Sequence, residues 1–357
     1  MTTGLRHGAR TIGDGLRARE DNFLWLRIIA ALMVIYGHSL IISPSPGVID
    51  LFAPWRTYSG EMAVDIFFAL SGFMVSGSFV RRPDLVDFMT ARVLRLVPAL
   101  LVCLMLLAYV FGPALSSMDA HSYFAEKLPR RFVKWNLQFA WRQSYLLPGV
   151  FNANPVKDTV NGSLWTIPAE MRMYVFLAIF GVLGFFRSRL VATFILISLF
   201  VAGVMVPWQL PLFDAWLKMA GYFGLGVLAF LYRDDIPVRT DILLALAGLA
   251  FLSRAVWAYP VLVALTLTYF CFWFAYRLKL PSIEKFGDPS YGTYLWGWPA
   301  SQAFAQFVGS GHPYGCALTA GLTCLMLGYL SWHTIEKPAL RLKSRVHSMF
   351  RFRERGA

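Results

Sequence analysis

Long apolar runs separated by short polar segments dominate this chain. We count ten such runs, at residues 23–43, 61–80, 92–112, 164–186, 189–207, 213–232, 238–254, 257–276, 289–309 and 314–335. A helix needs about 20 apolar residues to cross the hydrocarbon core of a membrane, and these runs lack the alternation of barrel strands. Because only helices and closed barrels satisfy the backbone in lipid, the pattern predicts an all-α integral membrane protein, a bundle of about ten transmembrane helices.

Composition and charge agree with this prediction and fix an orientation. Apolar residues make up 57% of the 357 positions and charged residues only 15%, against about 25% in an average soluble protein, which argues against a soluble enzyme. The net charge of +13 would suggest a nucleic-acid partner in a soluble protein. With the N-terminus inside, however, the inner segments hold 20 Lys and Arg and the outer segments seven or eight. This asymmetry predicts that both termini are cytoplasmic and that no nucleic acid is bound.

The same pattern divides the chain into three regions. Residues 1–22 form a basic N-terminal tail, 23–340 the membrane domain with one long outer loop at 113–163, and 341–357 a basic C-terminal tail. We expect no cleavable signal peptide, because the first run is too long for one. The C-terminal tail should be drawn to anionic lipid. The four cysteines lie in apolar runs and match no metal motif, so we expect no metal site.

Two ionisable residues of the first run share one helix face. Arg27 and His38 are eleven residues apart, which places them within about 20° of each other around a helix and about 16 Å apart along its axis. Ionisable groups inside a membrane are costly and therefore mark functional sites. His38 is the candidate general base; the alternative is a structural histidine bonded to a neighbouring carbonyl.

Two carboxylates are predicted at the depth of His38. Asp65 in the second run and Glu170 in the fourth should lie about 6–9 Å below the outer boundary. A carboxylate beside His38 would fix its tautomer and raise its basicity. The alternative for both is a polar tie between helices, and the sequence leaves open which of the two pairs with His38.

A basic cluster is predicted at the opposite, inner side. Arg92 and Arg95 lie one turn apart at the start of the third run, near the depth of Arg27. Three guanidinium groups at one mouth suit an anionic ligand such as phosphate. The alternative is the ordinary basic flank of a membrane helix. The two layers together favour a donor with phosphates at one end and a reactive group on a long arm.

Six sequence elements resemble the membrane acyltransferase-3 family. They occur in the family's order and span residues of about 25 to 340: LRIIAALMVIYGH (26–38), GEMAVDIFFALSGFM (60–74), FMTARVLRLVPAL (88–100), NGSLWTIPAE (161–170), SYGTYLWGWP (290–299) and EKPAL (336–340). The chain is similar to stand-alone members, with no hydrolase-like domain expected after the last run. Two positions depart from the family pattern: Ala63 replaces a glycine, and Gly297 stands where many members have a histidine.

The resemblance implies a membrane O-acyltransferase, with acyl-coenzyme A as co-substrate and no bound cofactor. Such an enzyme moves an acyl group, which we expect to be acetyl, onto a hydroxyl of a carbohydrate or glycoconjugate at the outer side of the membrane. We expect the bacterial inner membrane as its location. The resemblance makes His38 the catalytic histidine and Arg27, Arg92 and Arg95 essential basic residues that bind the acyl donor. Asp65 and Glu170 fall on matching acidic positions.

Some alternatives stay open at this stage. His38 could take the proton of the acceptor hydroxyl directly, or an acyl-His intermediate could form. Another class is a transporter of a sugar conjugate or an anion, although we find no internal repeat of the kind that transporters show. For the acceptor we expect contacts from Tyr291, Tyr294 and Trp165, with an interfacial aromatic belt as the alternative. The acceptor, the acyl group and the oligomeric state are not set by the sequence.

Overall fold

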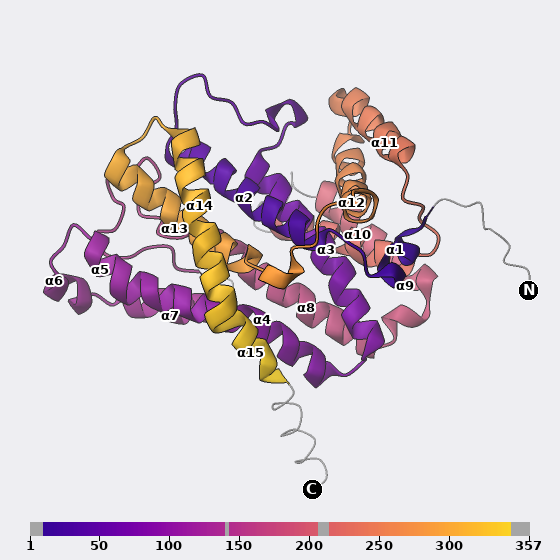
Figure 1. Cartoon of the computed structure of the whole chain (residues 1–357), viewed down its shortest axis with the longest axis horizontal. Helices are drawn as coiled ribbons and strands as arrows, with labels where there is room; N and C mark the ends of the chain where they lie inside the picture. The colour runs from indigo at the N-terminus through magenta and orange to yellow at the C-terminus, as the bar shows by residue number, and fades with distance from the viewer. Residues whose placement is uncertain (1–9, 140–142, 206–213, 344–357) are drawn as a thin grey trace, which may run out of the picture. The chain divides into compact units, whose positions relative to one another are not determined.

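The computed structural model describes residues 10–139, 143–205 and 214–343, and these residues form helices joined by turns and by longer loops at 43–58 and before residue 162 (Figure 1). Within these ranges there is no β-strand, and two isolated bridges join Thr11 to Pro237 and Ser116 to Val150. The all-α class is thereby confirmed. The chain divides into two compact units: unit 1 comprises Met1–Arg27, Asp65–Val80 and Gly184–Ile283, and unit 2 comprises Ile28–Val64, Arg81–Leu183 and Glu284–Ala357.

Unit 1 is built from the predicted runs in the middle of the chain. Its helices are α1 (Ile12–Ala18), the first turn of α2 (Phe23–Ile42), most of α3 (Ser59–Arg81), α9 (Arg189–Met205), α10 (Asp214–Leu231), α11 (Thr240–Leu252) and α12 (Tyr259–Arg277). The predicted boundary between the seventh and eighth runs is present, because α11 stops before a short 3₁₀ turn at Ser253–Ala255. Pro260 then stands in the first turn of α12, where a missing N–H costs nothing.

Glycines let α3 and α10 approach each other closely. A Cβ at Gly226 would lie 2.0 Å from the carbonyl oxygen of Ala69, and a Cβ at Gly72 would lie 2.0 Å from that of Phe223. Small residues of this kind are the usual contact between membrane helices. The start of α2 packs nearby through Phe23, whose ring is 5.8 Å from the ring of Phe73.

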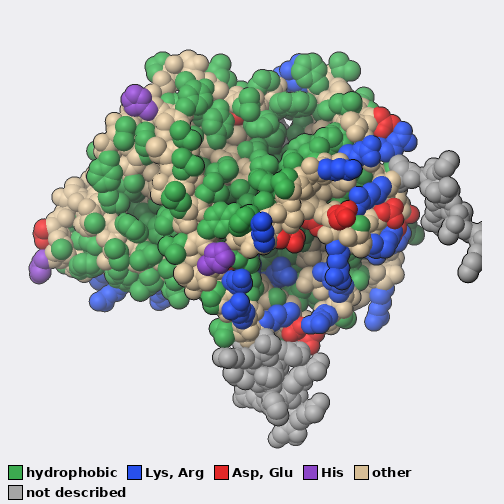
Figure 2. Space-filling model, viewed as in Figure 1, with side chains coloured by type: hydrophobic (Ala, Val, Ile, Leu, Met, Phe, Trp, Pro, Cys, Tyr) green, Lys and Arg blue, Asp and Glu red, His purple; other side chains and the backbone are tan. Residues whose placement is uncertain are grey.

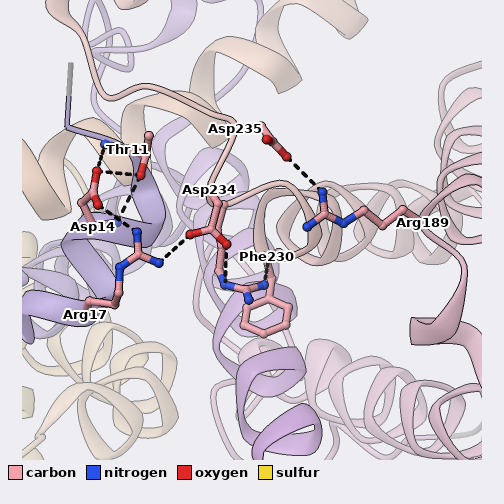
Figure 3. A network of polar contacts seen from close by, with 8 residues as sticks. Thr11, Asp14, Arg17, Arg189, Phe230, Asp234 and Asp235 are labelled. Atoms are coloured by element: carbon pink, nitrogen blue, oxygen red, sulfur yellow. Dashed lines mark hydrogen bonds and ion pairs between the residues drawn. The ribbon is translucent and has the colours of Figure 1, made fainter. Parts of the chain in front are cut away.

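The N-terminal tail contains a helix that the sequence pattern did not predict. Thr11 and Asp14 form a reciprocal capping box at the start of α1, and the Asp14 pKa is lowered to about 2 by its hydrogen bonds to Thr11 and Arg17. Arg17 also bonds Asp234, 2.6 Å away in the loop after α10 (Figure 3). Seven residues are too few to show periodicity, so this helix is defined by its caps and ion pairs.

Unit 2 carries the remaining helices. They are the rest of α2, the first turns of α3, α4 (Leu85–Leu106), α5 (Gly112–Leu115), α6 (Ala120–Ala125), α7 (Leu128–Leu137), α8 (Ile167–Val182), α13 (Ser290–Val308), α14 (Pro313–Ser331) and α15 (Lys337–Arg341). Short π-helical turns at Leu107–Phe111 and Trp332–Glu336 continue α4 and α14. The short α6 and α7 lie in the predicted outer loop, of which residues 140–142 are outside the described part.

Helices α13 and α14 form a hairpin in unit 2. Gly309 and Gly311 in the connection have φ values of +98° and +95°, a conformation that favours glycine. Along the hairpin a Cβ at Gly292 would lie 2.8 Å from Gly328 Cα, so the two helices approach through paired glycines. Gly297 likewise faces α2, because a Cβ there would lie 2.7 Å from Ile35. A larger side chain at this position would require Ile35 to move.

Five helical segments are long and apolar enough to cross a membrane among the described residues. They are Phe23–Ile42, Ser59–Arg81, Leu85–Leu115, Tyr259–Arg277 and Pro313–Arg341. Arg189–Gly203 and Trp216–Leu231 are shorter apolar helices, and part of the predicted runs 189–207 and 213–232 falls outside the described residues. Each of the ten predicted runs contains a helix, but the count of ten spans and the cytoplasmic termini remain predictions.

Large apolar side chains also cover much of the surface, as Figure 2 shows for one face. Leu190 on α9, Leu252 on α11 and Met326 on α14 are more than 70% exposed. A water-soluble protein seldom exposes extended apolar surface. Together with the apolar helices, this surface fits a multi-pass integral membrane protein.

Candidate functional site

His38 occupies a buried position in the half of α2 that belongs to unit 2. Its side chain is 7% exposed, and its Nδ1 atom has no hydrogen-bond partner among the described residues. The neighbouring group is an indole: the rings of His38 and Trp298 on α13 are 4.6 Å apart between centroids, at an interplanar angle of 73°. A buried ring nitrogen without a partner is rare in folded proteins. It is available to a group that binds there.

Glu170 hydrogen-bonds to a tyrosine one turn further along α8. The hydroxyl of Tyr174 donates to its carboxylate, and the Tyr174 ring lies 5.6 Å from the Arg92 guanidinium of α4. Glu170 also interacts electrostatically with Arg95 and Arg92. Within unit 2, therefore, Glu170 interacts with Tyr174 and with the arginines of α4, and its pairing with His38 stays a prediction.

Arg95 is held between two carboxylates. Its guanidinium bonds Asp288, 2.5 Å away just before α13, and Glu336, 2.7 Å away in the π turn after α14. The Glu336 side chain is fully buried and also accepts from Ser331. A buried guanidinium needs partners of this kind. Arg95 thus ties α4, α13 and the end of α14 together.

Two of the sequence-predicted site residues belong to unit 1. Asp65 on α3 is buried, and its carboxylate lies 3.0 Å from the ammonium of Lys218 on α10. Arg27 on α2 is partly buried and belongs to the same unit. The pairing of His38 with Asp65, and the joint cluster of Arg27 with Arg92 and Arg95, therefore stay predictions.

The tyrosines expected to contact substrate are bonded within unit 2. Tyr291 donates to the carbonyl of Leu96, 3.0 Å away, and its ring lies near the Arg95 guanidinium. Tyr294 bonds the hydroxyl of Thr166 at 2.6 Å, and both tyrosines are buried. Trp165, in the 3₁₀ turn Gly162–Thr166, is only partly buried. Of these three side chains, Trp165 is the one with exposed surface that a substrate could contact.

Sequence reasoning missed several residues that now border these groups. Lys218 is the one cation in the apolar run 213–232, and a charge in such a run is itself a signal of function. Asp288 precedes a helix and also bonds Ser290, which makes it look like an ordinary helix cap. Trp298 was one aromatic residue among several in its segment. Within the described residues no group of three or more His, Cys, Asp and Glu side chains could hold a metal ion.

Comparison with known proteins finds a matching family and several relatives. A profile of the acyltransferase-3 family, described as an acyltransferase domain, matches residues 21–331. An O-acetyl transferase of Shigella phage Sf6 is 26% identical over 336 residues, which cover 91% of this chain and 98% of that protein. Nodulation protein 10 of Rhizobium leguminosarum bv. viciae is 26% identical and covers 91% of this chain and 94% of its own length.

A third relative is longer than this chain. The match to a putative peptidoglycan O-acetyltransferase of Bacillus subtilis is 25% identical and covers 78% of this chain but 50% of that protein. No solved structure matches. The relatives that are named for an activity are thus O-acetyltransferases.

Proposed function

We propose that this chain, which belongs to the acyltransferase-3 family, transfers an acetyl group from acetyl-coenzyme A to a hydroxyl of a carbohydrate or glycoconjugate at the outer side of the membrane. Acyl transfer to oxygen is supported by the family and by the O-acetyltransferase relatives. The donor, the acceptor class and the side of the membrane are our proposal. The observation that carries the mechanism is His38, buried in an apolar helix, whose Nδ1 atom has no hydrogen-bond partner among the described residues.

His38 acts as the general base in this proposal. The acceptor hydroxyl gives its proton to the imidazole while its oxygen bonds the thioester carbonyl carbon. The carbon–sulfur bond then breaks, and the coenzyme A thiolate takes the proton back from the imidazolium. The ester and free coenzyme A leave, and His38 is neutral again. In this proposal the Nδ1 atom, which has no hydrogen-bond partner among the described residues, is the nitrogen that takes this proton.

The arginines of α4 have separate roles in the proposal. Arg92 lies over the rings of Phe88 and Tyr174, each 5.6 Å from its guanidinium carbon, and we assign it to the donor phosphates. Arg95 holds α4 against Asp288 and Glu336 and positions Arg92 one turn away. Arg27 and Asp65 keep the roles that the family resemblance implies, as predictions on unit 1.

The test is acyl transfer by the purified protein in detergent. The acceptor is the glycolipid fraction from cells that lack this protein, and the donor is acetyl-coenzyme A labelled in the acetyl group. We expect label to enter the glycolipids and alkaline treatment to release it as acetate, because the product is an ester. A transporter needs a sealed compartment and would leave the glycolipids unlabelled, so an unlabelled fraction would overturn the proposal.

A further inference from the structure

The contact between His38 and Trp298 has no counterpart in the sequence-based mechanism. The rings meet edge to face, at 4.6 Å and 73°, which is a favourable geometry for two aromatic groups. A carboxylate usually orients a catalytic histidine. In unit 2 the candidate carboxylate, Glu170, accepts a hydrogen bond from Tyr174, and His38 Nδ1 has no hydrogen-bond partner among the described residues. The indole of Trp298 does contact the imidazole.

Trp298 is itself fixed by the loop before α8. Its Nε1 donates to the carbonyl oxygen of Thr159 at 2.9 Å, and Gln302, one turn further along α13, donates to the same oxygen. Gly162 packs directly against the indole, since a Cβ there would lie 2.7 Å from the ring. The loop therefore holds the indole from two sides, and the indole in turn limits the rotation of the His38 ring.

We propose that Trp298 is a positioning residue for His38, whose indole orients the imidazole and stabilises the imidazolium formed during acyl transfer. The attraction between a cation and the π-system of tryptophan supplies the stabilisation. This attraction increases when His38 gains the acceptor proton, and it is lost when the coenzyme A thiolate takes that proton. The inference rests on the proposed function, because it assigns the partner of the same histidine.

The test compares two substitutions of similar size. Trp298→Phe keeps an aromatic ring but cannot donate to Thr159, whereas Trp298→Met keeps apolar volume without a ring. In the labelled-acetyl assay we expect Trp298→Phe within about threefold of the wild-type kcat and Trp298→Met about tenfold lower, the size of a moderately buried cation–π interaction. KM for acetyl-coenzyme A should be unchanged in both. Trp296→Met is the matched control on α13, where the indole contacts Phe111, and it should keep the wild-type kcat.

A spectroscopic readout separates this inference from the proposed function. In protein labelled with ¹³C-histidine, the imidazole signal absent from the His38→Gln spectrum belongs to His38. We expect an aromatic ring-current shift of that signal in wild type and Trp298→Phe, and its loss in Trp298→Met, whether or not the assay shows transfer. Equal kcat values for the Phe and Met variants, or an unshifted wild-type signal, would overturn the role of Trp298. Absence of transfer by wild type with the ring shift present would instead overturn the proposed function.

Discussion

Arg95 is the residue whose surroundings explain most about how the helices of unit 2 are held. It lies on α4, while its partners Asp288 and Glu336 are 193 and 241 positions further along the chain. The Glu336 side chain is fully buried. Removing one member of a buried charged network leaves the rest poorly compensated. The network therefore constrains the three helix segments that it joins.

We predict that Glu336→Gln lowers the stability of the protein by about 2 kcal/mol, the size of a buried hydrogen bond to a charged group. The substitution keeps the side-chain shape but removes the negative charge that Glu336 presents to Arg95. Thermal unfolding in detergent, followed by tryptophan fluorescence, should show a midpoint several degrees lower. Asp241→Asn is the control, because its ion pair with Arg239 is exposed and should contribute nothing measurable. Equal midpoints for Glu336→Gln and Asp241→Asn would contradict the structural role of the network.

The ionisable residues of the candidate site could be predicted from the sequence, but their contact partners could not. His38, Arg92 and Arg95 are marked by charge in an apolar run, a local signal that needs no knowledge of neighbours. Their partners depend on tertiary contacts between distant segments. Glu170 was expected near His38 from its depth in a span, yet it bonds Tyr174, four residues along its own helix. Helical rise gives the depth of a side chain but does not identify its hydrogen-bond partner.

At the scale of elements, the close crossing of α3 and α10 depends on glycine. A Cβ at Gly226 would meet the Ala69 carbonyl, whereas nothing lies within 4 Å of a Cβ at Gly248 on α11. Helix α11 was predicted from its apolar run, and its ends agree with the structure within a few residues. The capped helix α1 was not predicted, because a helix of seven residues carries no clear periodic signal.

We predict opposite effects for two glycine-to-alanine substitutions. Gly226→Ala should destabilise the protein by about 1–3 kcal/mol, the cost of overpacking a tight contact. Gly248→Ala should be neutral or stabilise by up to about 1 kcal/mol, because alanine favours the helix. Residual monodisperse protein after heating, measured by size-exclusion chromatography, ranks the variants. The prediction fails if Gly226→Ala is at least as stable as Gly248→Ala.

The cap of α1 gives a prediction about pH. The folded Asp14 pKa is about 2 and its ordinary value is 3.8, so its contribution to folding is fully present above about pH 4 and is lost as pH falls through about 2. Hydrogen exchange of residues 12–18 should be faster in Asp14→Asn than in wild type. After correction for intrinsic exchange, the ratio should be the same at pH 6 and pH 8. A ratio that changes between these pH values would show that another group controls the cap.

At the scale of the whole molecule, the exposed apolar surface and the distribution of basic residues each predict a different property. The exposed leucines and methionines favour insertion in lipid, and the asymmetry of Lys and Arg favours one orientation. The sequence could predict both properties, because they depend on composition summed over segments. Contacts between individual side chains, such as that of Arg95 with Glu336, are not contained in such sums.

We predict that both termini face the cytoplasm. A fluorescent protein fused after residue 357 should fluoresce, and alkaline phosphatase at the same place should be inactive. Phosphatase inserted after Lys157, in the predicted outer loop, should be active. Active phosphatase at the C-terminus would mean an odd number of spans and would contradict the predicted orientation.

The central claim is that His38 is the base for acyl transfer to a hydroxyl. The most direct measurement is the single-turnover rate of label transfer from acetyl-coenzyme A to the glycolipid fraction, for wild type and for His38→Gln at equal thermal stability. We predict a rate at least about 100-fold lower in His38→Gln, the lower end for loss of a general base. A folded His38→Gln protein that transfers acetyl groups at the wild-type rate would contradict it.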